Sequence, residues 1–158
     1  MNDTDSDARV RITSVINEYL VVLQRKPAGT LKELKELSRA MDRLVVCYHD
    51  TPDVEPDTTD SEAPRVDEAP LIKVATAAFP DLDWYALVDP QDGPDQQVGM
   101  SMAVGDLVEI AADLMEVLWL FDNASENDAI WQFRWGYQHH WGRHLHELRV
   151  YLHALSAW

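Results

Sequence analysis

Two sets of ionisable side chains in the C-terminal third of the sequence have spacings that can bring them together. Asp106, Glu109 and Asp113 are three and four residues apart, so on a helix they project from the same side. His140 and His144 are four residues apart, the spacing at which two imidazoles on one helix can bind one metal ion. On facing helices, the five side chains would form a site for a divalent metal.

The same residues also have simpler interpretations. Asp106 followed by Glu109 has the spacing of a capping box at the start of a helix. On a helical wheel, His140 projects nearly at right angles to the core, which predicts an exposed side chain. The motifs His-Glu-x-x-His and Glu-x-x-His are both absent from the sequence. A divalent metal is therefore a candidate cofactor that the sequence alone does not favour.

Arg134 is notable because the wheel places it in the middle of an apolar helix face. A buried guanidinium needs an anionic partner. Asp106 and Asp113 border the apolar face of the preceding helix, so we predict that Arg134 pairs with Asp113, with His144 nearby. Asp106, Asp113, Arg134 and His144 are thus the predicted buried polar cluster. In the alternative interpretation, Arg134 extends its charged end to the rim.

Nucleophilic catalysis has less support in the sequence. Cys47 is the single cysteine, and it lies beside Val45 and Val46 in a predicted helix, with His49 on a different face. We expect a buried, unreactive thiol. Glycine-rich phosphate loops, nucleophile elbows and zinc-ribbon patterns are absent, and no catalytic residue can be assigned.

Helices must position these side chains. Apolar residues recur at helical spacing over residues 8–26, 30–49, 71–79, 106–123 and 126–157. The last segment contains no proline and predicts one long helix with Ser125 as its N-cap, which Gly136 and Gly142 can bend or open to a neighbouring backbone. Residues 106–157 therefore predict a long helical hairpin.

The remaining segments connect these helices. Residues 51–70 contain four prolines and seven acidic residues, which predicts a mobile acidic loop. Residues 89–105 are irregular, although alternating apolar residues from Val98 to Val104 allow a short extended piece. We expect an all-α fold in which residues 1–158 form a single helical domain. Its predicted architecture is an antiparallel bundle of four main helices with short extra helices.

The formal net charge of −15 limits the partners of the protein. Phosphate backbones and anionic lipid surfaces repel such a chain, so we expect neither nucleic-acid nor membrane binding. Residues 1–7 lack the basic and apolar regions of a signal peptide, which predicts a cytoplasmic protein. No basic residue occurs between Lys73 and Arg134, and the acids in this stretch would attract cations or a basic protein.

Four segments carry a family resemblance: Asp106–Leu114 (DLVEIAADL), Ala129–Arg134 (AIWQFR), His140–Leu145 (HWGRHL) and Leu148–His153 (LRVYLH). In these segments the sequence resembles the DUF5063 domain proteins, a bacterial family without a characterised function. The resemblance implies a helical domain and no catalytic assignment. It singles out Asp106, Asp113, Arg134, Trp141 and His144.

Two functional hypotheses follow. The first is a non-enzymatic accessory or protein-interaction domain that acts with a protein partner or as a homodimer. The alternative is a metal-dependent hydrolase, with nucleotides as candidate substrates, in which Asp106, Glu109 and Asp113 hold the cation. All-α nucleotide pyrophosphatases carry paired Glu-x-x-Glu and Glu-x-x-Asp motifs on adjacent helices, whereas only one helix is so equipped here. The first hypothesis therefore leads.

Overall fold

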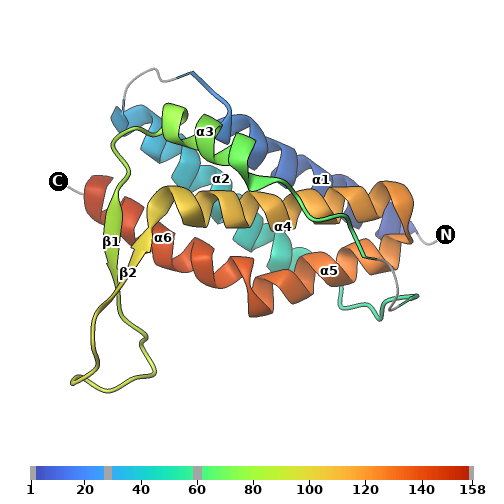
Figure 1. Ribbon diagram of the computed structural model, residues 1–158. Coiled ribbons are helices and arrows are strands. Elements are labelled where there is room, and N and C mark those ends of the chain that lie inside the picture. Colours follow the sequence, from blue (N-terminus) through green and yellow to red (C-terminus); the bar gives the residue numbers. More distant parts are fainter. Residues whose placement is uncertain (1–2, 27–29, 59–61, 157–158) are drawn as a thin grey trace.

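The protein is mostly helical in the computed structural model, which describes residues 3–26, 30–58 and 62–156 (Figure 1). In chain order the elements are α1 (Asp3–Leu23), α2 (Thr30–Asp50), α3 (Glu68–Ala78), β1 (Trp84–Leu87), β2 (Gly99–Met102), α4 (Ala103–Asn123), α5 (Glu126–His139) and α6 (Trp141–Ser156). Among the helices described, none combines the length and the apolar character needed to cross a membrane.

Helix α4 occupies a central place in the packing. It contacts α1, α3, α5 and α6, while α2 packs against α1 and α6. Its residues Leu107, Ile110 and Leu114 are fully buried. The largest fully buried side chains on the other helices are Ile12, Ile16, Tyr19, Leu37, Met41, Leu44, Ile130, Phe133 and Trp141. One continuous apolar core therefore fixes how α4 and α6 face each other.

The prediction of a single helix over residues 126–157 is wrong, because the helix is interrupted at His140. This residue has φ −143° and ψ −85°, outside the helical region. A Cβ on Gly142 would lie 2.1 Å from the carbonyl oxygen of Tyr137, and one on Gly136 would lie 2.7 Å from Cδ1 of Trp141. Both glycines therefore allow the close contacts of the break, which lets Trp141 enter the core.

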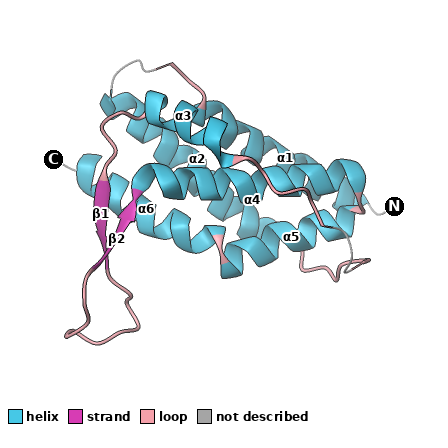
Figure 2. Ribbon diagram, viewed as in Figure 1, coloured by secondary structure: helices cyan, strands magenta, loops and turns pink. Residues whose placement is uncertain are grey.

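The all-α expectation also needs a correction. Strands β1 and β2 form a two-stranded antiparallel sheet that pairs Trp84 with Met102 and Leu87 with Gly99 (Figure 2). The alternation after Val98 indicates the second strand, but the first strand was not predicted from the sequence. Tyr85 is buried between two exposed neighbours, which is the alternation of a strand with one covered face.

The segment predicted to be a mobile loop makes hydrogen bonds to α5, and its last residues belong to α3. The backbone N–H of Thr58 donates to Oδ1 of Asp128 over 3.0 Å, and the Asn127 side chain donates to Asp57 over 3.1 Å. Helix α3 begins at Glu68, inside the predicted loop, with Asp67 as its N-cap. Residues 59–61 of this loop lie outside the described residues.

Candidate metal centre

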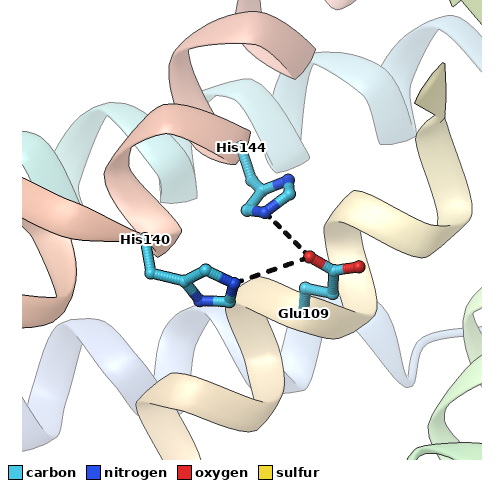
Figure 3. A group of neighbouring side chains, drawn as sticks. All are labelled: Glu109, His140 and His144. Atoms are coloured by element: carbon cyan, nitrogen blue, oxygen red, sulfur yellow. Dashed lines mark ion pairs between the residues drawn. The ribbon is translucent and has the colours of Figure 1, made fainter. Parts of the chain in front are cut away.

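The carboxylates of α4 face the histidines at the start of α6. Asp106, Glu109 and Asp113 project from one side of α4, His140 lies at the helix break, and His144 lies in the first turn of α6. In Figure 3 the rings of His140 and His144 point toward the Glu109 carboxylate. The structure therefore brings together all five residues of the predicted metal site.

Asp106 is a buried carboxylate whose side chain is only 3% exposed. It accepts hydrogen bonds from the Tyr85 hydroxyl at 2.6 Å, from the Ser101 hydroxyl at 2.9 Å and from Nδ1 of His144 at 2.9 Å. Burial, together with the hydrogen bond to Asp106 and its charge, raises the pKa of Tyr85 well above its usual value. Asp106 thus joins β1, β2 and α6 at one point.

The capping-box interpretation of Asp106 and Glu109 is wrong. Helix α4 begins at Ala103, after an N-cap at Met102 that makes no side-chain capping bond. Asp106 therefore lies inside the helix, where its carboxylate accepts from side chains of other elements instead of from the first amides of α4. Its burial is explained by these tertiary contacts.

His144 contacts two carboxylates through its two ring nitrogens. Nδ1 lies 2.9 Å from Asp106, and Nε2 lies 2.8 Å from Oε2 of Glu109. The hydrogen bond to Asp106 raises the pKa of His144, with a further increase from the charge of Glu109, against the opposing effect of burial. The carboxylates therefore hold the ring in a fixed orientation.

His140 repeats this arrangement with a different carboxylate. Its Nδ1 lies 2.7 Å from Oδ2 of Asp113, and its Nε2 lies 3.8 Å from Oε2 of Glu109. The side chain is about half exposed, and its ring lies 5.0 Å from that of His144. The break in the helix places this ring beside α4.

Glu109, His140 and His144 have the geometry of a ligand set. One ligand atom from each lies within 4.8 Å of the other two. Four-coordinate zinc with bonds of ~2.0–2.1 Å would hold its ligand atoms about 3.3 Å apart. The distances of 2.8 and 3.8 Å to Glu109 fall on either side of that value, so small side-chain movements would bring both histidine nitrogens to it. Both Nδ1 atoms meet a carboxylate, which is one of the acceptors that the second ring nitrogen of a metal-binding histidine usually has.

Comparison with known proteins places the chain in a family. Residues 4–157 match the family described as "Domain of unknown function (DUF5063)". The chain belongs to this family. The resemblance of the four C-terminal segments is thereby confirmed and extends over nearly all of this chain. No curated protein matches the chain.

The fold of this DUF5063 protein is also found in a solved structure. The crystal structure of protein BF1032 from Bacteroides fragilis is similar with a TM-score of 0.71. The match covers 94% of this chain and 95% of that chain, at 16% sequence identity. This likeness shows a common fold and carries no functional assignment.

Arg134 does not join the carboxylate–histidine cluster of the DUF5063 protein. Its Nη1 donates to the carbonyl oxygen of Thr51 over 2.7 Å, and its guanidinium lies 5.1 Å from the ring centre of Tyr48. Nε is 3.3 Å from Oδ1 of Asp53 but lacks hydrogen-bond geometry. The predicted pairing of Arg134 with Asp113 is therefore wrong, and the predicted polar cluster is divided into two regions.

Tyr85 and Ser101 are site residues that were not predicted from the sequence. Both hydroxyls donate to Asp106 from paired positions on β1 and β2. The available signal was the alternation along residues 98–104, which indicated a strand. It did not show that the inner face of this strand would meet the start of α4.

Proposed function

We propose that this DUF5063 protein binds one divalent transition-metal ion through Glu109, His140 and His144. One observation carries the proposal. Nδ1 of each histidine meets its own carboxylate, Asp113 or Asp106, so that both Nε2 atoms lie next to the same oxygen of Glu109. A histidine that binds a metal usually donates its other ring N–H to a carboxylate, a backbone carbonyl or water, and here both rings meet a carboxylate.

The donor set favours particular metals. Two imidazole nitrogens and one carboxylate oxygen suit Zn²⁺ and other first-row transition metals, whereas Mg²⁺ and Ca²⁺ prefer oxygen ligands. Three protein ligands would leave a position for water on four-coordinate zinc, unlike the closed shell of a structural site. Zn²⁺ is therefore the first ion to test.

The test is calorimetric titration of tag-free, chelator-treated protein with Zn²⁺ and, separately, with Mg²⁺. We expect one Zn²⁺ per chain and no binding of Mg²⁺ at the same concentrations. Glu109→Ala and His140→Ala should abolish stoichiometric binding, and Asp113→Ala should weaken it by ~10–100-fold. His153→Ala is the matched control, because His153 is an exposed histidine on α6 outside the cluster. Unchanged Zn²⁺ affinity in His140→Ala would contradict the proposal.

We propose that the bound ion serves a non-enzymatic accessory function. The side chains around the metal site are mostly anionic, and burial together with the charge of Asp113 raises the pKa of Glu116 on the same helix. Arg143 on α6 is paired with Glu147 over 2.8 Å. Such a field disfavours the phosphates of a nucleotide.

A metal-dependent hydrolase, with nucleotides as candidate substrates, is the second candidate. It is favoured by the coordination position that three protein ligands would leave on the ion. Incubation of Zn²⁺- or Mn²⁺-loaded protein with ATP and p-nitrophenyl phosphate separates the two roles. Turnover that disappears in Glu109→Ala would establish the hydrolase, and turnover no greater than that of the free ion would support the accessory role.

The proposal also includes the architecture of the protein, its location and its partners. We propose that α1, α2, α4 and the consecutive pair α5–α6 are the main members of an antiparallel bundle within a single domain, supported by their mutual packing. The charge of −15 supports a protein that avoids nucleic acid and membrane surfaces. We also propose a cytoplasmic location and a protein partner or second copy of the chain.

A further inference from the structure

The β1–β2 ribbon has two unlike faces. On the inner face, the hydroxyls of Tyr85 and Ser101 bind Asp106. On the outer face, Trp84 pairs with Met102, next to the pair of Ala86 and Met100. Trp84 and Met100 are 57% and 60% exposed, respectively. A large indole and a flexible thioether, side chains that usually bury their surface, thus lie on the same face of the ribbon in contact with water.

The outer face is apolar along its whole length. Val88 and Val98 continue the alternation beyond the two strands, and both are exposed. Trp84, Ala86, Val88, Val98, Met100 and Met102 make up the face, and none carries a charge. In a chain of net charge −15, such an uncharged strip is a local exception. An exposed apolar patch of this kind marks an interaction surface.

The ribbon is also open at its edges. The sheet of the described residues contains only β1 and β2, so each strand has one long edge without a strand partner. Figure 1 shows the two strands at one end of the molecule, with the loop between them extending away from the helices. Unpaired edges can accept another strand, and two-stranded ribbons gain stability when a further layer covers them.

We propose that the outer face of the ribbon is the interface of a two-fold symmetric dimer of this chain. An uncharged face offers a charged partner no complementary group, whereas it is complementary to its own copy. When two ribbons cross in antiparallel orientation, their loops with Asp89, Asp92 and Asp95 lie at opposite ends, so the acidic residues are kept apart.

The size of the face fits a weak dimer. Its exposed apolar side chains amount to on the order of 500 Å² per copy, given that a large aromatic residue alone can bury ~150–250 Å². Two copies would then bury roughly 1,000 Å² in total, the lower limit for a specific interface. The proposal does not depend on metal binding, so it is tested with chelator present.

Salt distinguishes this dimer from a complex with a basic protein. Two chains of charge −15 repel each other, and salt screens the repulsion while leaving the apolar contact intact. The dimer should therefore become tighter as salt increases. A complex held by the acidic residues would become weaker under the same change.

The experiment is sedimentation velocity from 1 to 200 µM protein at low and high NaCl concentration with EDTA. We expect a monomer–dimer equilibrium in the micromolar range that shifts toward dimer at high salt. Met100→Lys places a charge on the face and should raise the dissociation constant at least tenfold. Val10→Lys, at an exposed valine on α1, adds the same charge elsewhere and should leave the dissociation constant unchanged.

The fold of each variant is checked by its thermal unfolding. If Met100→Lys is unfolded, Trp84→Ser provides the same test with a polar side chain on the same face. A chain that stays monomeric up to 200 µM at high salt would overturn the proposal. So would a dimer that forms equally well in Met100→Lys and Trp84→Ser.

Discussion

The two polar regions of this protein bury charge in different ways. Asp106 is 3% exposed, and its carboxylate accepts from side chains on β1, β2 and α6. Arg134 is 17% exposed, donates to the backbone carbonyl of Thr51, and lies near Asp53, which is 89% exposed. The first region is therefore held by side chains of regular elements, and the second by the backbone of a connecting segment. The stability of the first region should therefore depend far more on each single hydrogen-bond partner.

The largest effect is expected for Asp106→Ala. The substitution removes the shared acceptor of Tyr85, Ser101 and His144, and breaking such a buried charged network costs ~3–5 kcal/mol. Chemical denaturation followed by circular dichroism measures the change in the free energy of unfolding. Asp106→Asn, which keeps the shape and part of the hydrogen bonding, should lose less. A loss below about 1 kcal/mol for Asp106→Ala would mean that water replaces the carboxylate and that the region is not tightly coupled.

The structure places Asp106, Asp113 and the two histidines in one region and Arg134 in the other, whereas the sequence spacing grouped Arg134 with the first. Asp106, Glu109 and Asp113 lie on the uninterrupted helix α4, so their spacing defined a common side. Arg134 and His144 lie on opposite sides of the break at His140. A helical wheel assumes a rotation of ~100° per residue along one unbroken helix. Because the chain changes direction at the break, the wheel no longer relates the side-chain directions before it to those after it. Arg134 was therefore assigned to the wrong neighbours.

The second prediction tests the break itself. A Cβ on Gly142 would lie 2.1 Å from the carbonyl oxygen of Tyr137, and backbone cannot move aside as a flexible side chain can. Gly142→Ala should therefore cost ~2–3 kcal/mol, as expected for overpacking. It should also weaken Zn²⁺ binding, because the break positions His140 and His144.

Gly105→Ala is the matched control for this change. Gly105 also lies in a helix, but its added Cβ would meet the end of the Met102 side chain at 3.4 Å. The substitution should be neutral or stabilising by up to ~1 kcal/mol, since alanine favours helices over glycine. Equal losses of stability in the two variants would show that the close contact at Gly142 is not the cause.

The remaining differences between prediction and structure have a common physical origin. The composition of residues 51–58 shows few apolar side chains, which predicts mobility, but it does not show that Arg134 and Asp128 supply polar partners. The hydrogen bond from Tyr85 to Asp106 likewise depends on the pairing of β1 with β2, which are separated by a loop. Periodicity predicts what one element buries, whereas these contacts depend on which elements meet.

The third prediction concerns Arg134→Met and should show a smaller effect than Asp106→Ala. Methionine keeps much of the apolar contact, while the hydrogen bond to Thr51 and the contact with the Tyr48 ring are lost. Asp53 is already exposed to water, so the substitution leaves no buried charge unpaired. The expected cost is ~1–2 kcal/mol in the same denaturation experiment. A cost as large as that of Asp106→Ala would show that the two regions are equally coupled.

The smallest expected effect is a change in the reactivity of Cys47, which reports local opening of the second region. Its thiol is buried, and the Thr51 hydroxyl donates to its backbone carbonyl over 2.6 Å. Burial raises the pKa of Cys47, so a smaller fraction is thiolate at pH 8 than for a free cysteine, and alkylation by iodoacetamide should be slow and should increase with pH. Arg134→Met releases the carbonyl of Thr51 and should speed the reaction several-fold, as measured by mass spectrometry. His144→Ala, which alters only the first region, should leave the rate unchanged; if both variants speed it equally, the two regions open together rather than independently.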